Sequence, residues 1–260
     1  ILILNNSPNL IKRFPHIPGI DASGIIYYSN SKKFKRNDKV MVIARPLGIE
    51  RNGSFSEFIL VPESWVDKLP RGLTLKESMI IGTSGFTAIK AFNNSLKIIQ
   101  TNKKKPVLVT GASGNVGMFI VFLLKTYGID VEVISSKKET SNIFKILNIK
   151  KIHSPKKFLK SNNFGLLNEK YSVIFDNLGG DIIDNSLKYL IKGGMFVSIG
   201  NILNNVSKIN ILPLILRGIN IKGINAELTN LNERKKIFKR FNSLKFKKDL
   251  TKLVKVIKLK

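Results

Sequence analysis

Residues 106–124 read PVLVTGASGNVGMFIVFLL. The run begins with the apolar residues Val107, Leu108 and Val109, two of them β-branched, and ends with apolar residues at helical spacing. Between these two parts lie Gly111, Gly114 and Gly117. A strand, a glycine-rich turn and the start of a helix form the arrangement that binds the pyrophosphate of a dinucleotide. Glycines also gather in ordinary turns, but the flanking strand and helix favour the dinucleotide interpretation.

Each glycine of this turn has a predicted role. Gly111 lets the chain turn sharply after the strand, Gly114 lets a phosphate approach the backbone, and Gly117 lets the helix pack closely on the strand. The first N–H groups of the helix and its positive dipole end then face the phosphates. Residues 107–124 contain no charged side chain, over a length that also fits a membrane helix. The glycines and polar residues in the middle favour a buried segment instead.

The amino-acid composition limits the classes of protein and of functional site that are possible. The chain has 260 residues, 43% of them hydrophobic and 23% charged, which is typical of a globular protein with one large or two modest domains. The absence of cysteine excludes a disulfide framework, a thiolate nucleophile and a cysteine-ligated zinc. With His16 and His153 as its two histidines, the chain is predicted to bind no metal, and both are predicted to be structural. No signal peptide is evident, so we expect a cytoplasmic location.

The net charge of +27 raises the alternative of a nucleic-acid partner. The lysines are scattered, however, and asparagine and isoleucine are enriched along with them. Such a pattern is typical of a compositional bias over the whole sequence rather than of a binding patch. We therefore predict neither a nucleic-acid nor a membrane partner.

The elements are predicted in two groups. Strands at 22–28, 39–44 and 53–61 indicate a small β domain, and a helix capped by Thr74 and Glu77 follows to about residue 99. From residue 107, strands and helices alternate, with strands at 107–109, 131–135, 151–153, 172–176, 195–199 and 219–224 and helices at 140–147 and 181–191. This alternation predicts an α/β fold with a doubly wound parallel sheet. A basic, solvated helix from Arg234 and an edge strand at 253–259 are predicted to close the chain.

Six segments together resemble a known family. They are FPHIPGIDASG (14–24), GSFSEFILVP (53–62), IIGTSGFTA (80–88), VTGASGNVG (109–117), FDNLGG (175–180) and LPLILRGINIKGIN (212–225). In these segments the sequence resembles the zinc-free, quinone-oxidoreductase-like subgroup of the medium-chain dehydrogenase/reductase superfamily, which includes acryloyl-coenzyme A reductase. The resemblance implies a truncated GroES-like domain at residues 1–78, joined by 245–260, and a Rossmann domain at 79–244.

The resemblance implies NADPH as cofactor. The contacts that it carries over fall on Ser113, Gly114, Asn115, Val116, Ser135, Ser136, Lys137, Asn201, Ile215 and Ala226. Relatives have Ser-Gly-Arg where this chain has Ser135-Ser136-Lys137, and a further arginine where it has Pro155 followed by lysines.

The residues after the second strand of the sheet support NADPH independently. An enzyme that uses NAD places an acid there, to hold the ribose 2′-hydroxyl. This chain has two hydroxyls and a lysine, which suit a 2′-phosphate. Glu132 falls inside the strand and Glu139 beyond the turn, so neither replaces the acid. The alternative is that Lys137 is one of many surface lysines.

The resemblance implies an NADPH-dependent reductase of the activated carbon–carbon double bond of an enoyl thioester such as acryloyl-CoA. A quinone or another enone is the alternative substrate. A basic, non-catalytic nucleotide-fold protein that binds RNA is the alternative from another class. Residues 219–224 form an exposed sheet edge, and relatives pair such edges, so we also expect a homodimer.

No catalytic residue is assigned within this sequence. In relatives an Asn-Tyr-Lys-Asp run that lines the active site would precede Ile1, and a closing helix and strand would follow Lys260. We therefore expect the 260 residues to bind NADPH weakly and to be inactive without those flanks. Thr83 and Thr87 could approach the nicotinamide, although hydroxyls bonded to their own helix are the simpler expectation.

Overall fold

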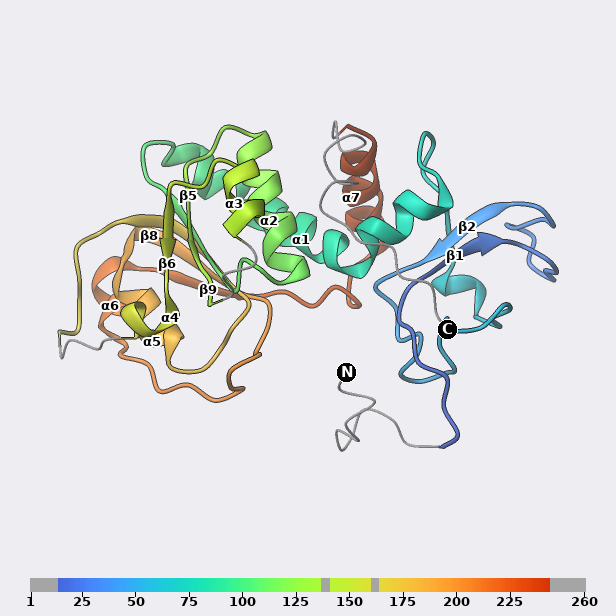
Figure 1. The fold of residues 1–260 in the computed structure, drawn as a ribbon, viewed down its shortest axis with the longest axis horizontal. Helices are drawn as coiled ribbons and strands as arrows, with labels where there is room; N and C mark the ends of the chain where they lie inside the picture. The colour runs from blue at the N-terminus through green and yellow to red at the C-terminus, as the bar shows by residue number, and fades with distance from the viewer. Residues whose placement is uncertain (1–13, 137–140, 160–163, 244–260) are drawn as a thin grey trace. The chain divides into compact units, whose positions relative to one another are not determined.

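The computed structural model describes residues 14–136, 141–159 and 164–243 (Figure 1). The chain divides into two compact units. One runs up to Phe86 and resumes at Ala226, and the other is Thr87–Asn225. The sequence had placed these boundaries after residues 78 and 244. They differ because residues 79–86 of the helix Leu75–Thr101 and the whole helix Leu231–Ser243 belong to the first unit.

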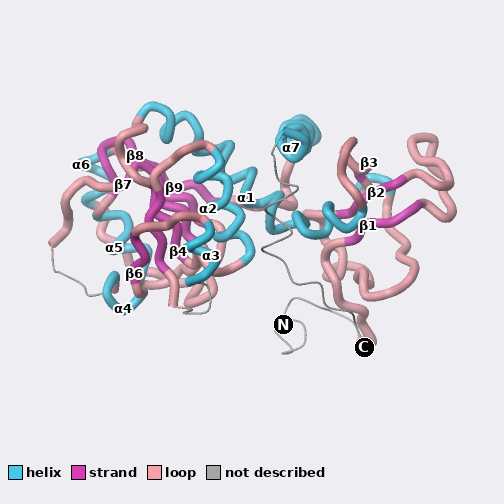
Figure 2. The backbone as a smooth tube through the Cα atoms, turned by 45° about the horizontal axis from the view of Figure 1, so that its top comes forward, coloured by secondary structure: helices cyan, strands magenta, loops and turns pink. Residues whose placement is uncertain are grey.

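The first unit contains a small antiparallel sheet in the order β1-β2-β3 (Figure 2). Its strands are Ala22–Ile25, Lys39–Val42 and Asp67–Lys68, and a 3-10 turn, Glu63–Trp65, precedes the third. The predicted strands at 22–28 and 39–44 are confirmed in shorter form.

The predicted strand at 53–61 is wrong, because this segment contains no strand. The Gly53 N–H donates to the Ile17 carbonyl at 2.6 Å, in a loop pairing rather than a ladder. Phe58 is 70% exposed and Leu60 87% exposed, so the alternating apolar residues cover no core. Alternation predicts a strand only where one face is buried.

The helix α1, Leu75–Thr101, begins with the predicted capping box. The Thr74 hydroxyl accepts from the Glu77 N–H at 3.1 Å, and the Thr74 N–H donates to the Glu77 carboxylate at 2.7 Å. At Gly82 the backbone leaves the helical region, with φ 48° and ψ −160°. The helix therefore breaks there and starts again at Thr83.

The last described helix, α7 (Leu231–Ser243), is anchored by a buried arginine. Arg234 is 1% exposed and donates to the Asp67 carboxylate and to the Ile43 carbonyl. Its guanidinium also lies over the rings of Phe86 and Phe238, 4.7 and 5.4 Å from their centroids. The helix was predicted correctly, but the expectation of a solvated basic face is wrong for Arg234. The predicted strand at 253–259 lies outside the described residues.

The second unit is a six-stranded sheet in the order β6-β5-β4-β7-β8-β9, with every neighbouring pair parallel. In chain order the strands are β4 (Val107–Thr110), β5 (Val131–Ile134), β6 (Lys151–His153), β7 (Tyr171–Asp176), β8 (Leu190–Ser198) and β9 (Asn220–Gly223). The helices are α2 (Asn115–Thr126), α3 (Ser141–Ile146), α4 (Pro155–Phe158), α5 (Ile182–Lys188) and α6 (Leu212–Arg217). The doubly wound parallel sheet is confirmed, while α4 and α6 were not predicted.

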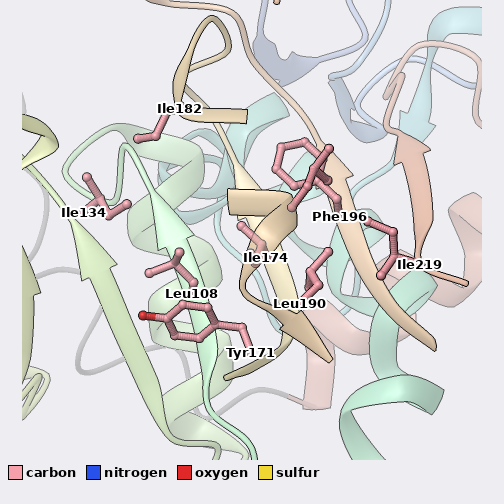
Figure 3. Close-up of a cluster of buried hydrophobic side chains, with 9 residues drawn as sticks. Leu108, Ile134, Tyr171, Ile174, Ile182, Leu190, Phe196 and Ile219 are labelled. Carbon is pink, nitrogen blue, oxygen red and sulfur yellow. The ribbon is translucent and has the colours of Figure 1, made fainter. Parts of the chain in front are cut away.

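Helices cover both faces of this sheet. Figure 1 shows α2 and α3 on one side and α4, α5 and α6 on the other. The second side holds a buried apolar cluster (Figure 3), made of Leu108, Ile134, Tyr171, Ile174, Ile182, Leu187, Leu190, Phe196 and Ile219. β4 is buried along its whole length, as a central strand covered on both faces must be. In the described parts of the chain, no helix is both long and apolar enough to cross a membrane.

Candidate cofactor-binding site

The strand order reverses at β4. Strands β5 and β6 extend the sheet on one side of β4, and β7, β8 and β9 extend it on the other. In open parallel sheets, ligands bind outside the carboxyl ends of the strands at such a switch point. The loops that follow β4 and β7 are therefore the candidate site, and both contain glycines in the left-handed region.

The loop between β4 and α2 has the geometry that its glycines predicted. Gly111 has φ 58°, and its carbonyl accepts from the Gly114 N–H at 2.9 Å. A Cβ on Gly117 would lie 2.5 Å from the Gly111 oxygen, so this position requires glycine. A Cβ on Gly114 would meet no atom closer than the Gly111 oxygen at 3.3 Å. The structural roles of Gly111 and Gly117 are confirmed, and the phosphate contact at Gly114 stays a prediction.

The start of α2 fits an anionic ligand. Gly114 is its N-cap residue, and no side chain caps the helix. The first N–H groups of a helix have no intrahelical partner and lie at its positive dipole end. Ser113 and Val116 are half-buried beside this end, and Asn115 is exposed. The four predicted residues 113–116 thus form one open, uncapped helix start.

The end of β5 presents the predicted hydroxyls. Ser135 is half-buried and its N–H donates to the His153 carbonyl at 3.1 Å, while Ser136 is exposed. Lys137 and Glu139 lie outside the described residues. Pro155 begins α4, and Lys156 is exposed on it.

The Glu132 side chain forms hydrogen bonds within the sheet and does not lie at the carboxyl end of β5. Its side chain is buried, and Lys151, Lys170 and the Tyr171 hydroxyl donate to it at 3.1, 2.7 and 2.8 Å. His153 Nε2 lies 2.8 Å from the same carboxylate. Burial alone would raise the pKa of Glu132, but these hydrogen bonds hold that pKa at about 2. The sequence signal was an acid within an apolar strand, with Lys151 and His153 on the next strand and Lys170 just before β7.

The remaining predicted contacts lie on other elements. Asn201 is exposed in the loop after β8, next to the loop after β7, because a Cβ on Gly179 would lie 2.9 Å from the Asn201 Cα. Ile215 is 66% exposed on α6. Ala226 begins the returning part of the first unit.

Thr83 is bound to an acid that the sequence analysis did not single out. Its hydroxyl donates to Asp21 at 2.5 Å and accepts from the Ala44 N–H at 2.6 Å. The Thr83 N–H also donates to Asp21, at 2.9 Å, so this carboxylate caps the helix after the break at Gly82. The expected bond of the Thr83 hydroxyl to its own helix is therefore wrong. Thr87 is 8% exposed.

The comparisons with known proteins agree with this fold. A family model described as "Zinc-binding dehydrogenase" matches residues 115–241. "Putative quinone oxidoreductase YhfP" of Bacillus subtilis is 31% identical over 235 residues, which cover 90% of this chain and 71% of YhfP. The chain belongs to the quinone-oxidoreductase-like medium-chain dehydrogenase/reductase family. The predicted resemblance is confirmed.

Three further comparisons extend across the family. "Acrylyl-CoA reductase AcuI" of Ruegeria pomeroyi is 28% identical, over 92% of this chain and 72% of AcuI. The structure of Salmonella enterica yhdH in complex with NADP has a TM-score of 0.87 and 28% identity, over 93% of this chain and 74% of that one. The structure of YhfP has NAD bound, with a TM-score of 0.84 over 90% of this chain and 71% of that chain. Members of this dehydrogenase/reductase family are thus similar to the chain through both of its units.

The residues of this family member do not fit a zinc centre. The chain contains no cysteine. Within residues 14–136, 141–159 and 164–243, no three His, Cys, Asp or Glu side chains gather closely enough to hold a metal ion. His16 Nε2 lies 2.9 Å from the Gly48 carbonyl and His153 lies beside Glu132, so each histidine has a hydrogen-bond partner within the fold.

Proposed function

We propose that this oxidoreductase is an NADPH-dependent reductase of the activated carbon–carbon double bond of an enoyl thioester such as acryloyl-CoA. The observation that carries the proposal is the open, uncapped start of α2, placed by Gly111 and Gly117 at the switch point of the sheet. Similarity to AcuI over 92% of the chain supports the substrate class. A quinone or another enone is the second candidate, supported by similarity to YhfP. The cytoplasmic location stays a prediction.

The cofactor is NADP(H), as in the yhdH complexes of Salmonella enterica and Escherichia coli. We assign residues 113–116 to its pyrophosphate and Ser135, Ser136 and Lys137 to its 2′-phosphate. We assign Asn201, Ile215 and Ala226 to its nicotinamide half. These contacts are proposals that rest on the loop geometry and on the family's pattern.

When bound, the cofactor supplies the hydride that adds to the β-carbon of the unsaturated thioester, and a proton from an acid or from water completes the reduction at the α-carbon. The chain contributes binding and orientation. The N–H groups at the start of α2 would hold the pyrophosphate, because the helix dipole and the first donors of a helix suit an anion. Fixing the pyrophosphate in this way places the rest of the cofactor relative to the sheet.

A ternary-complex titration tests the proposed substrate without requiring turnover. NADPH fluorescence is measured on the wild-type chain, and acryloyl-CoA, its saturated analogue propionyl-CoA, or menadione is then added. We expect both thioesters to change the fluorescence of bound NADPH at lower concentration than menadione does. A response to menadione alone would favour the quinone candidate. RNA retention that falls with salt, without any NADPH binding, would instead favour the non-catalytic class.

Lys137→Ala is expected to weaken NADPH binding and to leave NADH binding nearly unchanged. A charged hydrogen bond to the 2′-phosphate contributes roughly 1–2 kcal/mol, and NADH lacks that group. Fluorescence titrations with both cofactors measure the effect. Lys104→Ala, which removes an exposed lysine elsewhere in the same unit, is the matched control. Equal losses for NADPH and NADH would refute the assignment.

We also propose a homodimer that forms through β9, the exposed edge of the sheet. The Ile224 N–H donates inward to the Ser198 carbonyl at 3.0 Å. Because donors alternate sides along a parallel strand, the Ile221 N–H faces outward from the sheet. Ile221 is also 45% exposed. The edge thus offers both a free donor and an apolar side chain to a second copy.

Ile221→Pro is expected to convert this dimer to a monomer, because it removes the outward donor without touching the inner ladder. Light scattering of the purified chain gives the mass. Ile221→Ala keeps the N–H and should remain dimeric at the same concentration. A dimeric proline variant would rule out pairing through this edge.

A further inference from the structure

Asp176 is the last residue of β7, and its side chain is fully buried at the switch point. Its carboxylate joins the ends of two strands, because the hydroxyl of Thr110, the last residue of β4, donates to Asp176 Oδ1. The Leu178 and Gly179 N–H groups donate to the same carboxylate, at 3.3 and 3.0 Å. The sequence shows this residue only as the acid of FDNLGG.

The direction of these hydrogen bonds requires an acceptor at Asp176. The Thr110 hydroxyl accepts from the Asn177 N–H at 3.1 Å, so its own proton points to Asp176. The Leu178 and Gly179 N–H groups can only donate. All three groups around the carboxylate are therefore donors, and a protonated Asp176 would face no acceptor among them. Burial raises the pKa of Asp176, and the hydrogen bonds from Thr110 and the two amides oppose that rise.

The same carboxylate fixes a third loop indirectly. Gly179, which it binds, packs so closely on the loop after β8 that a Cβ would lie 2.4 Å from the Asn204 carbonyl. The Leu203 N–H donates to the Leu178 carbonyl at 2.7 Å. A Cβ on Gly200 would likewise lie 2.7 Å from the Asn177 carbonyl. The loops after β4, β7 and β8 are thus held together around one buried acid.

We infer that Asp176 is a positioning residue for the cofactor, which sets the loop of residues 111–117 and the loop that carries Asn201 at one fixed spacing. The inference rests on the proposed function, because these loops are the ones assigned to the pyrophosphate and to the nicotinamide half. Asp176 itself is buried beneath them and does not need to touch the cofactor. A dinucleotide that binds both loops requires their spacing to be set before it arrives.

Asp176→Asn tests the inference with almost no change of volume. The new amide group carries two N–H donors, so in either orientation one of them faces Thr110, Leu178 or Gly179, which also donate. Such a clash leaves buried donors unsatisfied, and we expect the NADPH dissociation constant to rise about tenfold. In the cofactor-free protein, hydrogen exchange at the Leu178, Gly179 and Leu203 amides should accelerate.

Three further variants separate positioning from general stability. Thr110→Val removes the linking hydroxyl and should reproduce both effects, whereas Thr110→Ser keeps the hydroxyl and should bind NADPH like the wild type. Glu132→Gln alters the other buried carboxylate of the sheet, away from these loops, and should lower stability without changing the dissociation constant.

Wild-type affinity and wild-type exchange in Asp176→Asn would overturn the inference, as would an equal loss of affinity in Glu132→Gln. If the wild-type chain does not bind NADPH, the proposed function fails. The exchange measurements then still decide whether Asp176 holds the loops.

Discussion

Gly114→Val should abolish NADPH binding while the nucleotide unit stays folded. The added Cβ would meet the Gly111 oxygen at 3.3 Å, a small adjustment, and Gly114 has φ −79°, which valine adopts readily. The side chain would, however, occupy the space in front of the α2 N-terminus that we assign to the pyrophosphate. Fluorescence titration measures binding, and circular dichroism measures the fold.

The same substitution at two other glycines provides controls for this prediction. At Gly117 a Cβ would lie 2.5 Å from the Gly111 oxygen and 2.7 Å from the Ala112 Cα, so Gly117→Val should destabilise the unit by about 3 kcal/mol. At Gly223 a Cβ would meet no atom within 4 Å, so Gly223→Val should affect neither binding nor stability. If Gly114→Val binds NADPH normally, the loop is an ordinary turn.

Glu132→Gln is expected to remove most of the acid sensitivity of the nucleotide unit. The pKa of Glu132 is about 2 in the folded chain, against an ordinary value of 4.5. Between these values the unfolded chain binds the proton and the folded chain does not, so stability falls as the pH falls. The ionised carboxylate therefore contributes about 3 kcal/mol above pH 4.5, and that contribution is lost as the pH drops towards 2.

Urea denaturation from pH 7 to pH 2 measures this effect. The difference between wild type and Glu132→Gln should be largest at neutral pH and should shrink below pH 4.5. Glu57→Gln, at an exposed position, should follow the wild type throughout. A difference that does not vary with pH would show that the cluster acts through packing and not through charge.

The parallel sheet could be predicted because its signals are local. The segments 107–109 and 172–176 are rich in apolar residues and are closely followed by glycines. A short, mostly apolar segment of this kind is enough to predict a buried parallel strand. The strand at 53–61 was predicted from the alternation of apolar and polar residues, and that prediction is wrong. Its alternating apolar residues are exposed, and only the tertiary structure shows whether an alternating face is covered.

The candidate site also has a part that could be predicted from the sequence and a part that could not. The turn with Gly111, Gly114 and Gly117 lies within one short segment of the sequence. Both its geometry and its place in the fold could therefore be predicted. Asp176 could not be assigned a role, because Leu178 and Gly179 are its neighbours in the sequence but Thr110, which links it to β4, lies 66 residues away. The buried environment of Arg234 was missed for the same reason, since its partners Asp67 and Ile43 lie far away in the chain.

The central claim is that NADPH binds at the carboxyl ends of the strands of the six-stranded sheet, around the switch point between β4 and β7. Amide chemical shifts recorded during an NADPH titration test this claim most directly. We predict that the largest shifts fall on residues 111–117, on Ser135 and Ser136, and on the loop around Asn201, saturating at one NADPH per chain. An absence of shifts, or shifts confined to residues outside these loops, would contradict the account.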